Sequence, residues 1–136
     1  MHQHWTDLRT FTTANFRVVL SCTEDDDLDL SWDETGEVAE KLESGEWTNF
    51  LFRVAVHGPT GELAADYLGG SIYADPLEFM DHRKCGLLNR VRAAEGKTVR
   101  CGGYFSSMVG RACDEARKEW ERVSRRVAGT GLLRAA

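Results

Sequence analysis

Apolar and polar residues alternate along three stretches of the chain, and this period of two predicts β-strands. The clearest stretch is 47–57, in which bulky apolar side chains take every second position. Residues 62–73 follow it after the turn-forming sequence Gly-Pro-Thr-Gly, which predicts an antiparallel hairpin. A further strand is expected over 11–22. The pair Gly69-Gly70 inside the returning strand predicts either a β-bulge or a close approach of another backbone segment.

A period of three to four residues predicts a long final helix from about Tyr104 to Val127. Its apolar positions form one continuous stripe, and basic residues occupy much of the remaining surface. The stripe consists of Phe105, Met108, Val109, Ala112, Ala116, Trp120, Val123 and Val127.

Shorter helices are expected at three places upstream of the long one. The sequence Ser-Trp-Asp-Glu has the form of a capping box, so a helix capped by Ser31 should follow and end at Gly45. Asp75, followed by a proline, predicts a second helix that carries Phe79, Met80 and His82. Residues 87–95 should add another turn or two.

These elements predict the order β-α-β-β-α-α and an α+β fold. We expect an antiparallel sheet of three or more strands, packed on one face by helices, with a long C-terminal helix. At 136 residues, and with no repeat or linker to divide it, the chain should form a single domain over 1–136.

Composition indicates where in the cell the protein is located and in which oxidation state its cysteines are. No apolar run approaches the roughly 20 residues that a membrane span needs, and the first residues lack the pattern of a signal peptide. We therefore expect a cytoplasmic protein without membrane contact. The four cysteines are widely spaced, so buried reduced thiols are the expectation.

Charge is sorted along the chain. Residues 1–78 carry 16 acidic and 4 basic side chains, a net charge of −12, whereas residues 79–136 carry 6 and 13, a net charge of +7. Two opposite surface fields of this kind steer association with partners. A sequence pI of about 5.4 argues against general coating of DNA.

The acidic residues are densest between the first strand and the first expected helix. As a calcium loop this segment fails, because Leu30 stands where the turn glycine is needed and Gly36 where the bidentate glutamate is needed. It can be interpreted as a solvated mobile loop, or as a phosphate-like surface that imitates nucleic acid. On the second interpretation the partner-binding residues are Glu24, Asp25, Asp26, Asp27, Asp29, Asp33, Glu34, Glu37 and Glu40.

Other chemistry has weaker support in the sequence. His82 and Cys85 have a spacing suited to zinc, and Cys101 with Cys113 could complete a tetrahedral site, but the second close ligand pair of a typical zinc site is missing. No phosphate-binding loop, dinucleotide motif or catalytic signature is present. We therefore predict no cofactor, no metal site and no catalytic residue. Direct nucleic-acid binding by the basic last helix is not favoured, because its aromatic residues belong to the apolar stripe.

Two segments carry a resemblance. The sequence GELAADYLGGSIYADPLEFMDH, which ends at His82, and the later run from Gly103 to Val109 resemble short accessory proteins of phages, plasmids and conjugative elements. Several groups of such proteins act as anti-CRISPR or anti-restriction inhibitors. The resemblance implies a non-enzymatic, host-directed inhibitor that binds a basic groove of a protein or ribonucleoprotein complex in the bacterial cell.

Two alternatives stay open at this point. The opposite charges of the two halves could pair between copies, which would make the protein a structural or regulatory module that self-associates as a homodimer. The third hypothesis is a small metal- or thiol-dependent enzyme that uses His82 and Cys85.

Overall fold

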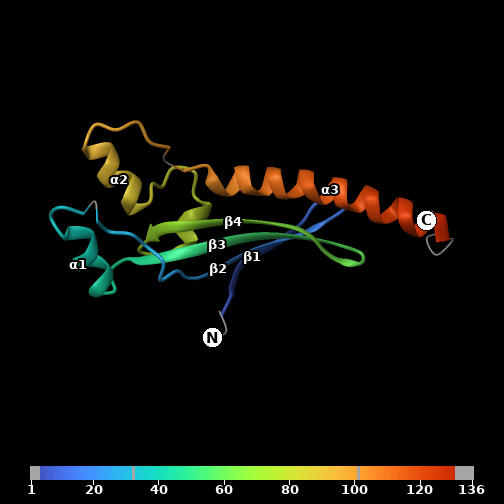
Figure 1. The fold of residues 1–136 in the computed structure, drawn as a ribbon, viewed down its shortest axis with the longest axis horizontal. Helices are drawn as coiled ribbons and strands as arrows, with labels where there is room; N and C mark the ends of the chain where they lie inside the picture. Colours follow the sequence, from blue (N-terminus) through green and yellow to red (C-terminus); the bar gives the residue numbers. More distant parts are fainter. Residues whose placement is uncertain (1–3, 32, 101, 131–136) are drawn as a thin grey trace.

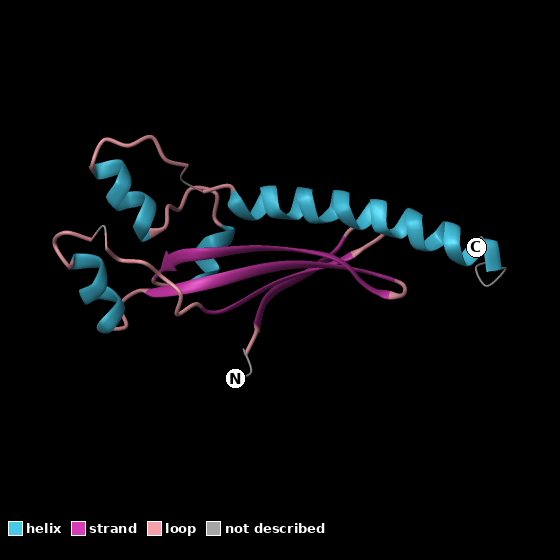
Figure 2. Ribbon diagram, viewed as in Figure 1, coloured by secondary structure: helices cyan, strands magenta, loops and turns pink. Residues whose placement is uncertain are grey.

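The computed structural model describes residues 4–31, 33–100 and 102–130, with side chains up to Arg126. Four antiparallel strands form one sheet in the order β1-β2-β3-β4, and a long helix lies along it (Figures 1 and 2). The strands are β1 Thr6–Thr12, β2 Arg17–Glu24, β3 Thr48–Gly58 and β4 Gly61–Tyr73. The predicted α+β class with a long C-terminal helix is confirmed.

The first predicted strand is in fact part of a hairpin. Residues 11–22 do not form one strand, because the chain reverses between β1 and β2. The backbone N–H of Thr13 donates to the carbonyl of Phe16 at 2.8 Å, and the Thr13 hydroxyl accepts from the Phe16 N–H at 3.2 Å. The observed order is therefore β-β-α-β-β, then a 3₁₀ helix and two α-helices.

The second hairpin follows its prediction closely. Residues of β3 and β4 pair from Thr48 opposite Tyr73 to Gly58 opposite Gly61. The register shifts between Phe50 and Phe52, where β4 contributes the extra residue of a bulge around Gly69 and Gly70. Gly70 has a φ of 62°, which a residue with a side chain adopts only at a cost. The predicted bulge is confirmed.

The main core lies between the sheet and α3, which spans Tyr104–Thr130. Phe52 is fully buried and stacks on Phe79 with ring centroids 3.9 Å apart. From the helix, Met108, Ala112 and Ala116 fill the same core, as the apolar stripe predicted. Small residues at two of these three positions let the helix backbone approach the sheet closely.

Three short helices complete the fold: α1 Glu37–Glu43, the 3₁₀ helix η1 Pro76–Met80 and α2 Leu87–Ala94. Side chains alternate along β4, so Ile72 projects away from the main core that Tyr73 joins. Ile72 instead packs with Val38 of α1 and Leu87 of α2 in a second cluster. Both short α-helices thereby gather at one end of the sheet (Figure 1).

The predicted starts of the short helices had different outcomes. Asp75 caps η1, accepting a hydrogen bond from the Leu77 N–H at 2.9 Å, but this helix ends at Met80 and leaves His82 outside it. The capping box at Ser31 is wrong. A turn from Leu30 to Asp33 comes first, and α1 begins after Gly36, whose φ of 72° marks the actual cap position. Trp32, the second residue of the predicted motif, lies outside the described residues.

Candidate functional site

The acidic segment from Glu24 to Glu40 connects β2 to α1 and continues along the exposed side of that helix. It lies at the end of the molecule opposite the C-terminal end of α3 (Figure 1). The charge sorting in the sequence is only partly a separation in space, because α2 and its arginines lie at the same end of the molecule as the acidic segment (Figure 1).

This segment is tied to the sheet at its first residue. The backbone N–H of Asp25 donates to the carbonyl of Asn49 at 3.0 Å, and the Asn49 side-chain amide donates to the carbonyl of Asp25 at 2.8 Å. Further along, Leu28 and Leu30 pack against the second core cluster, while the carboxylates between and beside them face solvent. Backbone pairing and apolar anchors thus give the acidic segment an ordered path.

Two of the nine predicted partner-binding carboxylates, Asp25 and Asp33, are half-buried and accept backbone hydrogen bonds that hold the segment in place. Asp25 accepts from the backbone N–H groups of Asp27 at 3.1 Å and of Gly70, in the β4 bulge, at 3.4 Å. Asp33 accepts from the Ala39 N–H at 3.0 Å and so takes the capping role in α1 that Ser31 was expected to have. Both side chains position the segment.

The remaining seven carboxylates are exposed, and we call them the acidic ridge: Glu24, Asp26, Asp27, Asp29, Glu34, Glu37 and Glu40. Glu37 pairs with Lys41 at 3.7 Å. Asp29 accepts a hydrogen bond from the Ser31 backbone N–H at 2.9 Å, and this bond, with one from the Ser31 hydroxyl, lowers the pKa of Asp29. Leaving Asp29 aside, no other ridge carboxylate has a Lys or Arg partner within the described part of the chain.

Most cations of α3 pair with carboxylates outside the ridge. Arg117, Lys118, Arg122 and Arg125 each pair with a carboxylate three or four residues away on the same helix. Arg111 reaches Asp66 of β4 at 3.0 Å. The acidic ridge is therefore not neutralised by α3, although Arg92 and Lys97 lie near Glu34 and line one hollow with it.

A hollow of about 370 Å³ adjoins the ridge, between the acidic segment and the start of β3. Leu28, Leu30, Leu42 and Trp47 give it an apolar lining, and Glu24, Asp25, Asp26 and Asn49 add polar groups. Sequence reasoning missed it. The signal present was Leu28 and Leu30 placed between carboxylates, which indicated an anchored segment rather than a free loop.

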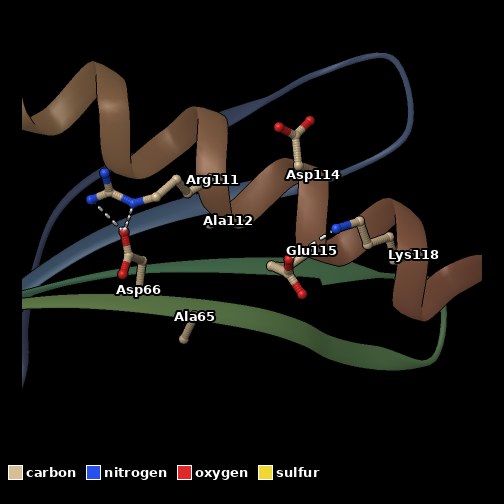
Figure 3. A pocket seen from close by; sticks show the side chains of 7 residues that line it. All are labelled: Ala65, Asp66, Arg111, Ala112, Asp114, Glu115 and Lys118. Carbon is tan, nitrogen blue, oxygen red and sulfur yellow. Dashed lines mark hydrogen bonds and ion pairs between the residues drawn. The ribbon is translucent and has the colours of Figure 1, made fainter.

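A second hollow, of about 280 Å³, lies between β4 and α3 (Figure 3). Its charged side chains engage one another: Arg111 points to Asp66, and Lys118 pairs with Glu115 at 3.4 Å. Asp114 points away from Asp66 and pairs with Arg117. A charged ligand would have to break these ion pairs in order to bind, so this hollow is a poor candidate for a binding site.

The cysteine and histidine residues were the candidates for a metal site. Among the described residues, no three His, Cys, Asp or Glu side chains are grouped as metal ligands would be. Cys22 and Cys113 are buried free thiols whose pKa burial raises, as expected for reduced core cysteines. The same expectation is wrong for Cys85, which is disulfide-bonded, and Cys101 lies outside the described residues.

The membrane-crossing potential of the helices and the comparisons with known proteins complete the description of the chain. In the described ranges, no helix combines the length and apolar character that a membrane crossing requires. No protein-family model, curated protein or solved structure gives a significant match to the sequence or fold. The site can therefore be interpreted only from its own geometry: an α+β domain with an ordered acidic ridge at one end.

Proposed function

We propose that this protein is a non-enzymatic binding protein whose acidic ridge occupies a Lys/Arg-lined groove on a protein or ribonucleoprotein complex. The observation that carries the proposal is the combination of order and unneutralised charge. Asp25 and Asp33 fix the segment, while the ridge carboxylates stay exposed. A groove that normally holds nucleic acid presents the complementary charge.

The resemblance of residues 61–82 and 103–109 to phage and plasmid accessory proteins supports a particular class of partner. We propose a bacterial defence complex, such as a CRISPR surveillance complex, which the protein inhibits by competing with nucleic acid. Many exposed carboxylates would make association fast at low salt and slower at high salt.

The test measures competition with nucleic acid on a panel of purified CRISPR and restriction complexes, using two charge-matched triple variants. The ridge triple variant is Asp27→Asn, Glu34→Gln and Glu40→Gln. The control is Glu115→Gln, Glu119→Gln and Glu121→Gln, which removes three carboxylates that already have partners on α3.

We expect the ridge triple variant to inhibit about ten-fold less well, from roughly 0.5 kcal/mol per exposed charge, and the control variant to inhibit like the wild type. Equal inhibition by the ridge triple variant and the wild type would refute a role for the ridge. If no complex on the panel is inhibited, the proposed class of partner is wrong.

Self-association is a second candidate, favoured by one observation. The ridge and the cationic end of α3 lie at opposite ends of the molecule (Figure 1). The ridge of one copy can therefore contact the end of α3 in another copy, head to tail. Light scattering at low and high salt separates the two candidates. A monomer at both salt concentrations would rule out pairing through these charges.

A further inference from the structure

The hollow beside the ridge has the chemical make-up of a site for one long side chain. Its volume of about 370 Å³ is near the lower end of ligand sites, which span roughly 300–1,000 Å³. One part of its lining is apolar, from Leu28, Leu42 and Trp47, and another carries carboxylates. An occupant that fits both parts has an apolar stem and a cationic end.

The polar part of the lining favours a hydrogen-bond donor. Glu24 and Asp26 have no cation partner in the part of the chain that the structure describes. Asn49 is only 7% exposed, and although its amide nitrogen donates to Asp25, its Oδ1 accepts no hydrogen bond from the described residues. A buried acceptor without a donor is costly, and a ligand that brings N–H groups would reduce that cost.

The apolar part shows which cation suits it. The guanidinium of Arg90, a residue outside the lining of the hollow, already lies 5.5 Å from the centre of the Trp47 ring. A guanidinium stacks on an indole face and is more weakly hydrated than an ammonium, so it loses less on leaving water.

We infer that this hollow receives an arginine side chain from the basic surface that the ridge binds, an inference that rests on the proposed function. The methylene groups of the arginine lie along Leu42 and Trp47. Its guanidinium reaches the carboxylates of Glu24 and Asp26. The ridge then supplies general attraction to a basic groove, and the hollow selects a groove that presents an arginine.

The probe is a hexa-arginine peptide, with hexa-citrulline as a neutral peptide of similar shape and hexa-lysine as a cation without a planar end. Binding to the full chain is measured by NMR of the tryptophan indole N–H groups. The resonance of Trp47 should move with saturating dependence on hexa-arginine and stay in place with hexa-citrulline. Trp120, which packs against the main core, serves as the internal reference.

Variants measure how much the hollow contributes. Trp47→Leu should weaken hexa-arginine binding about three-fold and leave hexa-lysine binding nearly unchanged, because only the guanidinium stacks on the ring. The matched control Tyr67→Leu removes an aromatic side chain that is 53% exposed and lies outside the hollow, and it should bind like the wild type. The pair Glu24→Gln and Asp26→Asn should weaken hexa-arginine binding roughly five-fold.

The outcomes separate this inference from the proposed function. If hexa-arginine binds and the ridge triple variant weakens it, while Trp47→Leu and the Trp47 resonance show no response, the hollow is not the site and the proposed function stands. If hexa-arginine does not bind the wild type at low salt, both fail. Should Trp47→Leu not fold, as judged by circular dichroism, the wild-type Trp47 resonance decides alone.

Discussion

The acidic ridge and helix α3 both carry dense charge, but they use it in opposite ways. On α3 the carboxylates alternate with cations at helical spacing, and the helix pairs most of its own charge. Along the ridge, carboxylates follow one another in the sequence, and Lys41 pairs with Glu37. The number of charges in a region therefore does not show whether they are available to a partner. The spacing of opposite charges decides whether they pair with one another instead.

The two regions also differ in what holds them in place. α3 is fixed by side chains buried in the main core, with Met108 and Ala116 fully shielded from solvent. The ridge is fixed by hydrogen bonds from Asp25 and Asp33 and by half-buried leucines. Three expected outcomes test this difference.

The largest effect should come from the α3 core. We expect Met108→Ala to lower the free energy of unfolding by about 3 kcal/mol, because it leaves a cavity in a packed interior. The ridge triple variant should change it by less than about 0.5 kcal/mol. Urea titration measures both, with the exposed Ser106→Ala on the same helix as a control. A ridge variant as unstable as Met108→Ala would contradict the assignment of the ridge to the surface.

A smaller effect should come from the cap of α1. Asp33→Ala removes the acceptor of the Ala39 N–H, so we expect a loss of about 1 kcal/mol. Glu34→Ala removes the same charge from the neighbouring position without removing a cap, and its stability should stay close to that of the wild type. Equal stability of the two variants in urea would show that Asp33 does not cap the helix.

The smallest effect concerns two lowered pKa values with different causes. The pKa of Asp29 is lowered first by the Ser31 backbone N–H, whereas that of Glu119 is lowered first by a side-chain hydrogen bond from Arg122. Arg122→Ala should therefore return Glu119 towards its ordinary value of 4.5, but Ser31→Ala should return Asp29 only part of the way towards 3.8. Carboxyl NMR titration measures both.

The sign of the pH effect follows from these directions. A carboxyl whose pKa is lower in the folded protein stabilises the fold above its unfolded pKa, and that contribution is lost as the pH falls through the folded value. Each substitution should thus remove part of this contribution at neutral pH, so the variant should lose less stability than the wild type as the pH falls. A full return of Asp29 in Ser31→Ala would show that the hydroxyl, and not the backbone, is the main cause.

Secondary structure could be predicted from the sequence where one hydrophobic periodicity dominated a segment. Alternating apolar residues predicted β3, and the stripe through Met108 and Trp120 predicted α3, because each element buries one face against a single core. The hairpin of β1 and β2 was not foreseen. β1 is an edge strand that is mostly exposed, with few apolar residues, and its turn contains neither glycine nor proline.

The negative charge of the site could be predicted from the sequence, but the contacts that hold the acidic segment in place could not. The nine carboxylates were identified from their density alone. That Asp25 would bind the backbone of Gly70 depends on a contact between distant parts of the chain, which local spacing does not encode. The hollow escaped prediction for the same reason, since Leu28 and Trp47 meet only after β2 and β3 have paired.

The β4 bulge contacts the side chain of Asp25, the residue at which the acidic segment leaves the sheet. A Cβ at Gly69 would lie 2.9 Å from the Oδ2 of Asp25, too close for both to remain where they are. Gain of a side chain at Gly69 would force the Asp25 carboxylate to turn away from Gly70. Because this carboxylate is the far end of a flexible side chain, Gly69→Ala should cost the hydrogen bond to Gly70 and leave the backbone pairing of Asp25 with Asn49 in place.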